Sequence, residues 1–142
     1  MAYLFDTDAL SEPLRSRPLP LFLDWLRVIP RDEQYTSAIV IGEMFKGAFR
    51  SSAQDRHLAN IEQRVLPAVT VLPYDVAVAR VYGEIRAGLE KTGAILPDAD
   101  LQIAATALHH GLSLATGNVQ HFSRIEELVI EPVLAEARQS DS

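Results

Sequence analysis

The chain has 142 residues, with 13 Lys or Arg against 19 Asp or Glu, so its formal charge is −6. One domain fits this length, since domains typically contain roughly 100–200 residues, and the absence of cysteine excludes disulfides, thiolate metal ligands and cysteine nucleophiles. The acidic balance argues against a large non-specific nucleic-acid-binding surface. There is no apolar run of about 18 residues and no signal-peptide pattern, so we expect a cytoplasmic protein without membrane association.

The first half of the chain alternates short apolar runs with helical periodicity. Residues 3–5 form an apolar run typical of a buried strand. Apolar side chains at helical spacing predict a helix over 19–29, and residues 34–36 favour a second strand. A serine cap and an apolar stripe predict a helix over 37–50, and a further helix is expected over 58–66, closed by a proline.

The same alternation continues in the second half. Residues 69–72 are β-branched and short, which is typical of a strand. An aspartate cap and an amphipathic pattern predict a helix over 75–89. Residues 98–109 are apolar nearly all round, so we expect a buried helix there. Strands are expected over 112–116 and 128–130.

Strands that alternate with helices predict a parallel sheet covered on both faces. The expected fold is therefore α/β, a single three-layer α/β/α domain around a central parallel sheet. We assign residues 1–135 to this domain and expect residues 136–142 to form a disordered polar tail.

Acidic and polar side chains follow several of the expected strands. Asp6 and Asp8 come directly after the first strand, Asn118 follows the strand at 112–116, and Asp98 and Asp100 open the buried helix. In open α/β sheets the working site lies beyond the carboxyl ends of the strands. Carboxylates that meet there repel one another unless a cation neutralises them, and oxygen donors fit Mg²⁺ or Mn²⁺.

Each of these acids also has a plain structural interpretation. Asp6 or Asp8 would serve equally well as a helix cap, and Asp98 fits a cap of the buried helix. Asp100 is harder to explain in this way, because its helical position faces the packed interior. Glu43 lies almost opposite the apolar stripe of its helix, where a solvated charge is the favoured interpretation.

The remaining polar candidates are weaker. Asn118 alone is typical of a turn. The histidines do not form a metal set, because His109 and His110 are adjacent and cannot share a helix face, while His57 and His121 lie in unrelated segments.

Four segments together resemble the PIN-domain ribonucleases, and within them the VapC type of toxin from bacterial toxin–antitoxin pairs. The segments are LFDTDAL (residues 4–10), TSAIVIGEMFKG (residues 36–47), DADLQIAATAL (residues 98–108) and ATGNVQHF (residues 115–122). They occur in the order and at the spacing of that family, and the resemblance extends from Leu4 to about Ile130.

The resemblance implies that Asp6, Glu43 and Asp100 bind the metal. It places Asn118 at the fourth catalytic position, where the family often has an aspartate. An asparagine can orient a water molecule there but carries no charge. Asp8 and Asp98 are additional acids beside the first and third positions.

The implied activity is Mg²⁺-dependent hydrolysis of RNA, with Mn²⁺ as a substitute, leaving 5′-phosphate and 3′-hydroxyl ends. The hydroxyl groups of Thr7, Ser37 and Thr116 are candidates for orienting carboxylates or water. Candidate contacts to the RNA backbone are Arg15, Arg17, Lys46, Arg50 and Lys91.

The resemblance also implies two protein partners. One is a small VapB-type antitoxin whose basic side chain enters the acidic groove. The other is a second copy of the chain, and we expect a homodimer formed by an exposed apolar patch that includes Phe22, Trp25, Tyr82 and Leu89.

Two alternatives remain open at this point. The neutral Asn118 favours a non-catalytic PIN-like module that binds RNA or protein without cutting. The Asp6-Thr7-Asp8 fragment resembles the nucleophile motif of haloacid dehalogenase-type phosphohydrolases, in which Asp6 would be phosphorylated. However, Ala9 follows where those enzymes usually have glycine.

Overall fold

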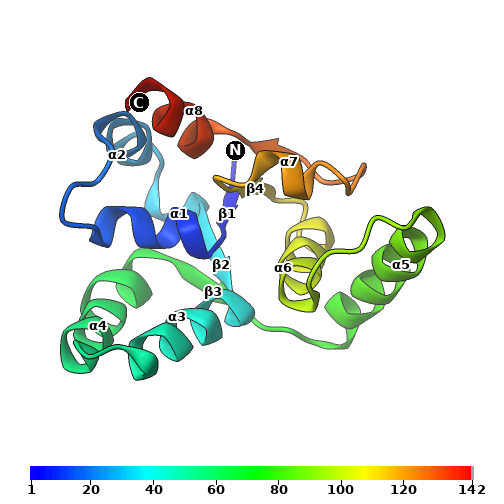
Figure 1. Ribbon diagram of the computed structural model, residues 1–142, viewed down its shortest axis with the longest axis horizontal. Coiled ribbons are helices and arrows are strands. Elements are labelled where there is room, and N and C mark those ends of the chain that lie inside the picture. Colours follow the sequence, from blue (N-terminus) through cyan, green and yellow to red (C-terminus); the bar gives the residue numbers. More distant parts are fainter. Residues whose placement is uncertain (142) are drawn as a thin grey trace.

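The computed structural model describes residues 1–141, which contain a five-stranded sheet in the order β3-β2-β1-β4-β5. All neighbouring strands are parallel, as expected. The strands are β1 Tyr3–Phe5, β2 Gln34–Ser37, β3 Thr70–Leu72, β4 Ser113–Ala115 and β5 Ile130–Glu131. Helices connect the strands (Figure 1), and the central strands β1 and β4 are largely buried.

The α-helices of the described residues are α1 Thr7–Ser11, α2 Pro20–Arg27, α3 Ala38–Arg50, α4 Gln54–Asn60, α5 Val76–Thr92, α6 Asp98–His109, α7 Val119–Phe122 and α8 Val133–Asp141. Short 3₁₀ turns η1 Glu12–Leu14, η2 Arg31–Glu33 and η4 Leu66–Ala68 join some of them. The π-helical turn η3 Ile61–Val65 extends α4.

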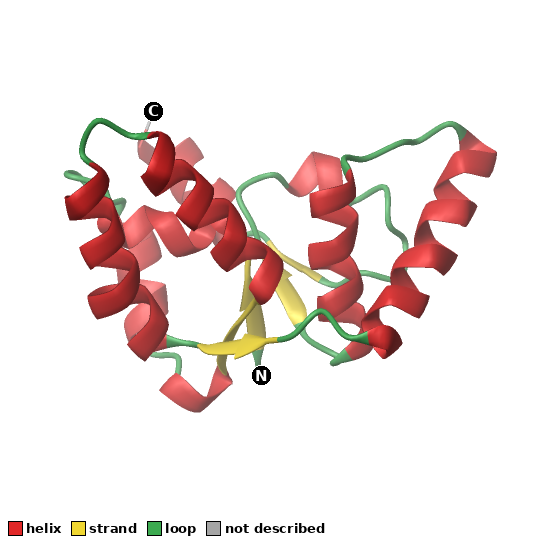
Figure 2. Ribbon diagram, turned by 90° about the horizontal axis from the view of Figure 1, so that it is seen from below, coloured by secondary structure: helices red, strands yellow, loops and turns green. Residues whose placement is uncertain are grey.

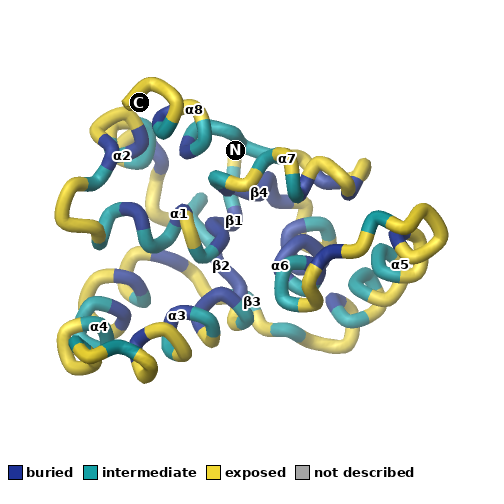
Figure 3. The backbone as a smooth tube through the Cα atoms, in the orientation of Figure 1, coloured by how far each residue is buried: buried dark blue, intermediate teal, exposed yellow. Residues whose placement is uncertain are grey.

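The two faces of the sheet carry separate cores. Leu4 and Leu114 lie opposite each other and face the core shared with α3, α4, α5 and α6. Phe5 and Ala115, the next pair, face the core shared with α1, α2 and α8. This alternation is the period of two of a β-strand. Figure 2 shows the strands between the two groups of helices, and Figure 3 shows the buried residues along the sheet. The three-layer α/β/α prediction is confirmed.

Local sequence signals set several helix ends. The Ser37 hydroxyl accepts a hydrogen bond from the Val40 amide at 3.1 Å and begins α3, and the Asp75 carboxylate accepts one from the Val78 amide at 3.0 Å and begins α5. Gly93 ends α5 with a φ of 73°, a left-handed conformation that favours glycine.

Some boundaries differ from the prediction. The last strand begins at Ile130 rather than at residue 128. Leu128 packs in the core, and the pairing with β4 begins where Ile130 lies opposite Leu114. The helix expected over 58–66 begins at Gln54. The short helices α1 and α7 have too few residues to show a periodic pattern.

The expectation of a disordered tail from residue 136 is wrong for residues 136–141, which belong to helix α8. Leu134 and Ala137, three residues apart, are 0% and 4% exposed and pack in the core beneath α2. Docking of this apolar edge holds the otherwise polar segment in place.

The expected apolar patch is also absent as an exposed surface. Phe22 is fully buried and Leu89 is 9% exposed, while Trp25 and Tyr82 are half-buried. Trp25 makes edge-on ring contacts with Tyr3 and Phe5 at centroid distances of 5.1 and 6.1 Å. These side chains complete the cores of the single chain.

Candidate active site

Asp6 lies at the carboxyl end of β1, where it links the strand to the first helix. Its backbone amide donates to the Ala115 carbonyl at 3.1 Å, which continues the pairing of β1 with β4. Its side chain accepts a hydrogen bond from the Ala9 amide at 2.9 Å and caps α1. The interpretation of Asp6 as a helix cap is therefore confirmed. The cap uses only one of the acceptor positions of the carboxylate, so the others are available to a further ligand.

The environment of Asp6 disfavours its negative charge. The residue is 7% exposed, and burial raises the pKa of Asp6 to about 6; the Thr116 hydroxyl and the Ala9 amide oppose this shift, while the charges of Asp8 and Asp100 add to it. When a buried carboxylate is also repelled by a second carboxylate, a cation that binds beside it stabilises its ionised form.

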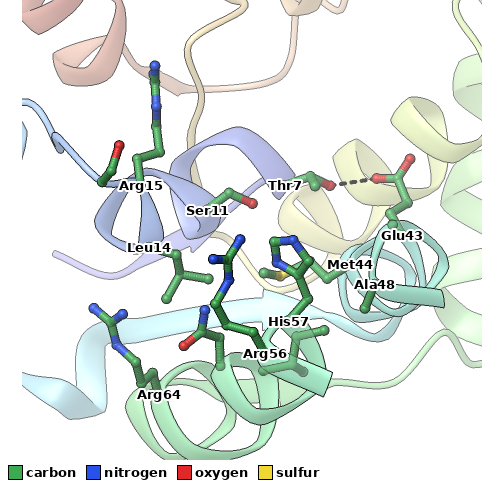
Figure 4. Close-up of a pocket in the computed structure, with 14 residues that line it drawn as sticks. Thr7, Ser11, Leu14, Arg15, Glu43, Met44, Ala48, Arg56, His57 and Arg64 are labelled. Carbon is green, nitrogen blue, oxygen red and sulfur yellow. Dashed lines mark hydrogen bonds between the residues drawn. The ribbon is translucent and has the colours of Figure 1, made fainter. Parts of the chain in front are cut away.

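Glu43 approaches this edge of the sheet from helix α3. The Thr7 hydroxyl donates a hydrogen bond of 2.6 Å to Glu43 Oε1 (Figure 4). Glu43 is half-buried, so the interpretation of a fully solvated charge is wrong. The helical wheel of α3 missed this contact because α1 covers the side of the helix that carries Glu43.

Asp100 lies in the first turn of α6 and pairs with a histidine from α7. His121 Nε2 is 2.8 Å from Asp100 Oδ2, and the two side chains are 20% and 28% exposed. Asp100 is thus half-buried rather than enclosed in the core. Sequence reasoning missed His121 because it lies in a separate segment, although the segment follows β4 and therefore starts at the same sheet edge.

The other acids at this edge point elsewhere. Asp98 accepts a hydrogen bond from the Tyr82 hydroxyl at 2.7 Å and pairs with Arg86, both on α5. Asp8 is exposed, and one oxygen lies 3.6 Å from Arg138 of α8.

Asn118 is exposed and precedes α7 without a side-chain cap; its backbone amide donates to the Thr116 hydroxyl at 3.0 Å.

The hydroxyl groups at the strand ends have distinct roles. Thr36 donates to the Phe5 carbonyl at 2.8 Å and joins β2 to β1, while Ser37 caps α3. The Thr7 hydroxyl donates a hydrogen bond to the candidate catalytic carboxylate of Glu43, and the Thr116 hydroxyl makes a side-chain hydrogen bond with Asp6. The edge is thus held together by buried, satisfied polar groups.

The donor set of this edge is chemically suited to a hard divalent cation. Asp6, Glu43 and Asp100 supply carboxylate oxygens, the ligands that Mg²⁺ prefers. Within residues 1–141, however, no three carboxylate or histidine side chains lie close enough together to enclose an ion. Asp100 instead contacts His121, and Glu43 contacts Thr7.

Comparison with known proteins identifies the class to which this fold and site belong. The PIN domain family matches residues 3–128, and the chain belongs to that family. This assignment removes the haloacid dehalogenase alternative. In addition, no helix within residues 1–141 is long and apolar enough to cross a membrane.

Individual relatives are similar over nearly their whole length. Toxin FitB of Neisseria gonorrhoeae is 34% identical over 134 residues, which cover 91% of this chain and 96% of FitB. Ribonuclease VapC2 of Haemophilus influenzae is 30% identical over 131 residues, which cover 92% of this chain and 97% of VapC2.

Solved structures of this group share the fold closely. The crystal structure of FitAcB from Neisseria gonorrhoeae superposes with a TM-score of 0.83 and 32% identity, covering 92% of this chain and 97% of that chain. The DNA-bound VapBC structure from Salmonella typhimurium superposes with a TM-score of 0.85 and 29% identity, with the same coverage of 92% and 97%.

Proposed function

We propose that this protein is a Mg²⁺-dependent endoribonuclease and the toxin of a VapBC-type toxin–antitoxin pair. The observation that carries the proposal is a buried carboxylate, Asp6, 7% exposed at the carboxyl end of β1 in a chain of the PIN domain family. Burial raises the pKa of Asp6, and the charges of Asp8 and Asp100 add to this rise. Retaining such a group costs stability in the free protein, so a bound cation is its expected partner.

In this proposal Asp6, Glu43 and Asp100 hold Mg²⁺, or Mn²⁺ in its place, directly or through water molecules, because the three carboxylates do not by themselves enclose an ion within residues 1–141. When bound, the ion supplies positive charge that polarises the phosphodiester and acidifies a water molecule. Thr7 keeps Glu43 oriented through its hydrogen bond of 2.6 Å, and His121 does the same for Asp100 at 2.8 Å. Asn118, exposed at the same edge, is available to orient water or substrate.

The enzymatic part is tested with purified protein and a single-stranded RNA. We expect cleavage in Mg²⁺, no cleavage in EDTA, and products with 5′-phosphate and 3′-hydroxyl ends. Asp100→Asn should abolish cleavage while the circular dichroism spectrum is retained. A fully active Asp100→Asn protein would contradict the proposal.

The toxin assignment draws on the relatives named FitB and VapC2 and on the FitAcB and VapBC structures of similar fold. Expression of the chain alone should arrest growth, co-expression with a small protein encoded beside it should restore growth, and Asp6→Asn should make that protein unnecessary. Harmless expression of the wild-type chain in its own host without the neighbour would remove the toxin assignment and leave the nuclease proposal standing.

The neutral, exposed Asn118 favours a second candidate, a PIN-like module that binds RNA or protein without cutting. The two candidates separate in the cleavage assay. Binding of RNA that is equal in wild type and Asp6→Asn, without cleavage by either, would favour the module.

A further inference from the structure

A cavity of about 780 Å³ opens beside the candidate active site. Thr7 and Glu43, the hydrogen-bonded pair described above, form part of its wall. From there it runs between α1 and η1 on one side and α3 and α4 on the other (Figure 4). Any ligand that fills the cavity therefore also reaches Glu43.

The charge of this cavity is opposite to that of the whole chain. Arg15, Arg56, Arg64 and His57 line it, against a single acid, Glu43, whereas the chain has a formal charge of −6. Of the basic residues nominated from the sequence, Arg15 alone is in this lining. The local excess of basic groups predicts an anionic ligand.

The four basic side chains differ in whether they already have a partner within the chain. Arg15 pairs with Glu12 at 3.3 Å, and Arg64 donates to the Pro13 carbonyl at 3.2 Å. Arg56 and His57, by contrast, have no hydrogen-bond or ion-pair partner within residues 1–141. Figure 4 shows both side chains extending from α4 toward α1. Their nitrogen atoms are thus free to donate to a ligand.

We infer that this cavity binds the RNA strand next to the scissile bond, with Arg56 and His57 donating to its phosphate oxygens. The inference rests on the proposed nuclease function, because a strand cleaved at Glu43 has to continue along a neighbouring surface. Arginine is suited to this contact, since its planar fork matches two phosphate oxygens. Leu14 and Met44 in the same lining offer apolar contact to a ribose or base.

The test measures RNA binding apart from cleavage. In an Asp100→Asn background, the affinity for a fluorescein-labelled single-stranded RNA of mixed sequence is measured by anisotropy at several salt concentrations. Arg56→Gln should weaken binding roughly tenfold, the effect of removing one charge-assisted hydrogen bond. The slope of log affinity against log salt should fall by about 0.7 for each phosphate that the variant no longer neutralises. His57→Gln should act in the same direction.

Arg80→Gln is the matched control, because Arg80 lies on α5, pairs with Glu84 at 3.3 Å and is outside the cavity lining. It removes the same charge and should leave binding within about twofold of the background. Unchanged RNA binding by Arg56→Gln, or equally weakened binding by Arg80→Gln, overturns the inference. Unchanged RNA binding together with weaker binding of the co-expressed antitoxin overturns it in favour of a protein ligand.

Two further outcomes distinguish RNA binding in the cavity from the nuclease activity on which the inference rests. If the wild-type chain cuts RNA but Arg56→Gln binds normally, the cavity assignment fails and the nuclease proposal stands. If the wild-type chain cuts no RNA while Arg56 still determines RNA affinity, the nuclease proposal fails and the binding site stands.

Discussion

The single residue Asp6, a candidate catalytic group, lowers the stability of the folded chain when it is ionised. Its pKa is raised from 3.8 to about 6, with burial as the largest cause. A carboxyl group with a higher pKa in the folded than in the unfolded chain holds its proton more tightly when folded. The free energy of unfolding therefore falls as pH rises from about 4 to above 6, and stays lower at higher pH.

We expect this decrease in metal-free protein to be about 3 kcal/mol, the equivalent of roughly two pKa units. Urea unfolding in EDTA at a series of pH values measures it. Asp6→Asn keeps an acceptor for the Ala9 amide but cannot ionise, so its stability should change less over this range. If the free energy of unfolding changed equally with pH in the two proteins, ionisation of Asp6 would not be the cause of the decrease.

His121 is a positioning residue by its contact with Asp100 at 2.8 Å. Removing such an outer contact typically costs about 10–100-fold in metal affinity or activity. We expect His121→Ala to raise the Mg²⁺ concentration for half-maximal cleavage by about this factor, with little change in the melting temperature in EDTA. A purely structural role would lower that melting temperature and leave the Mg²⁺ requirement unchanged.

At the scale of elements, helix α8 shows how a polar segment becomes part of the domain. Leu134 is fully buried in the core that also contains Phe22 of α2. Leu134→Ala should lower the free energy of unfolding by about 3 kcal/mol, within the range for large-to-small core substitutions. Leu21→Ala is the control, because Leu21 is 54% exposed and should cost much less. Equal effects in urea unfolding would mean that α8 is not docked.

Several elements could be predicted because their signals are local. The apolar run at residues 3–5 and the caps Ser37 and Asp75 predicted a strand and two helix starts close to the observed ones. The helix α8 was missed because its apolar edge consists of Val133, Leu134 and Ala137, too few residues to stand out in a polar segment before the rest of the core is in place.

The candidate site was predictable in part for a related reason. Asp6 and Asp100 stand out where a strand ends and where a buried helix begins. Glu43 did not, because its significance depends on Thr7 from another element. His121 likewise gains its role only when the end of β4 is brought beside α6. Contacts between elements distant in the sequence leave no periodic signal in either one.

At the scale of the whole molecule, the assembly state remains a prediction. The patch first expected is largely internal, yet Val76, the first residue of α5, and Ile95, three residues beyond its last, are 87% and 63% exposed. Light scattering should give twice the mass of one 15.7 kDa chain. A single-chain mass at high protein concentration would contradict the homodimer.

The proposed activity depends on one divalent cation held by Asp6, which follows β1, Glu43 of α3 and Asp100 of α6, directly or through water. Crystals grown with Mn²⁺ test it most directly, through the anomalous signal of the ion. We expect a peak at about 2.0–2.5 Å from carboxylate oxygens of Asp6 and Asp100, with Glu43 directly beside it or joined through water. The peak should be absent in Asp6→Asn crystals. Full Mn²⁺ occupancy elsewhere on the chain, with no peak at these carboxylates, would show that they do not form the metal site.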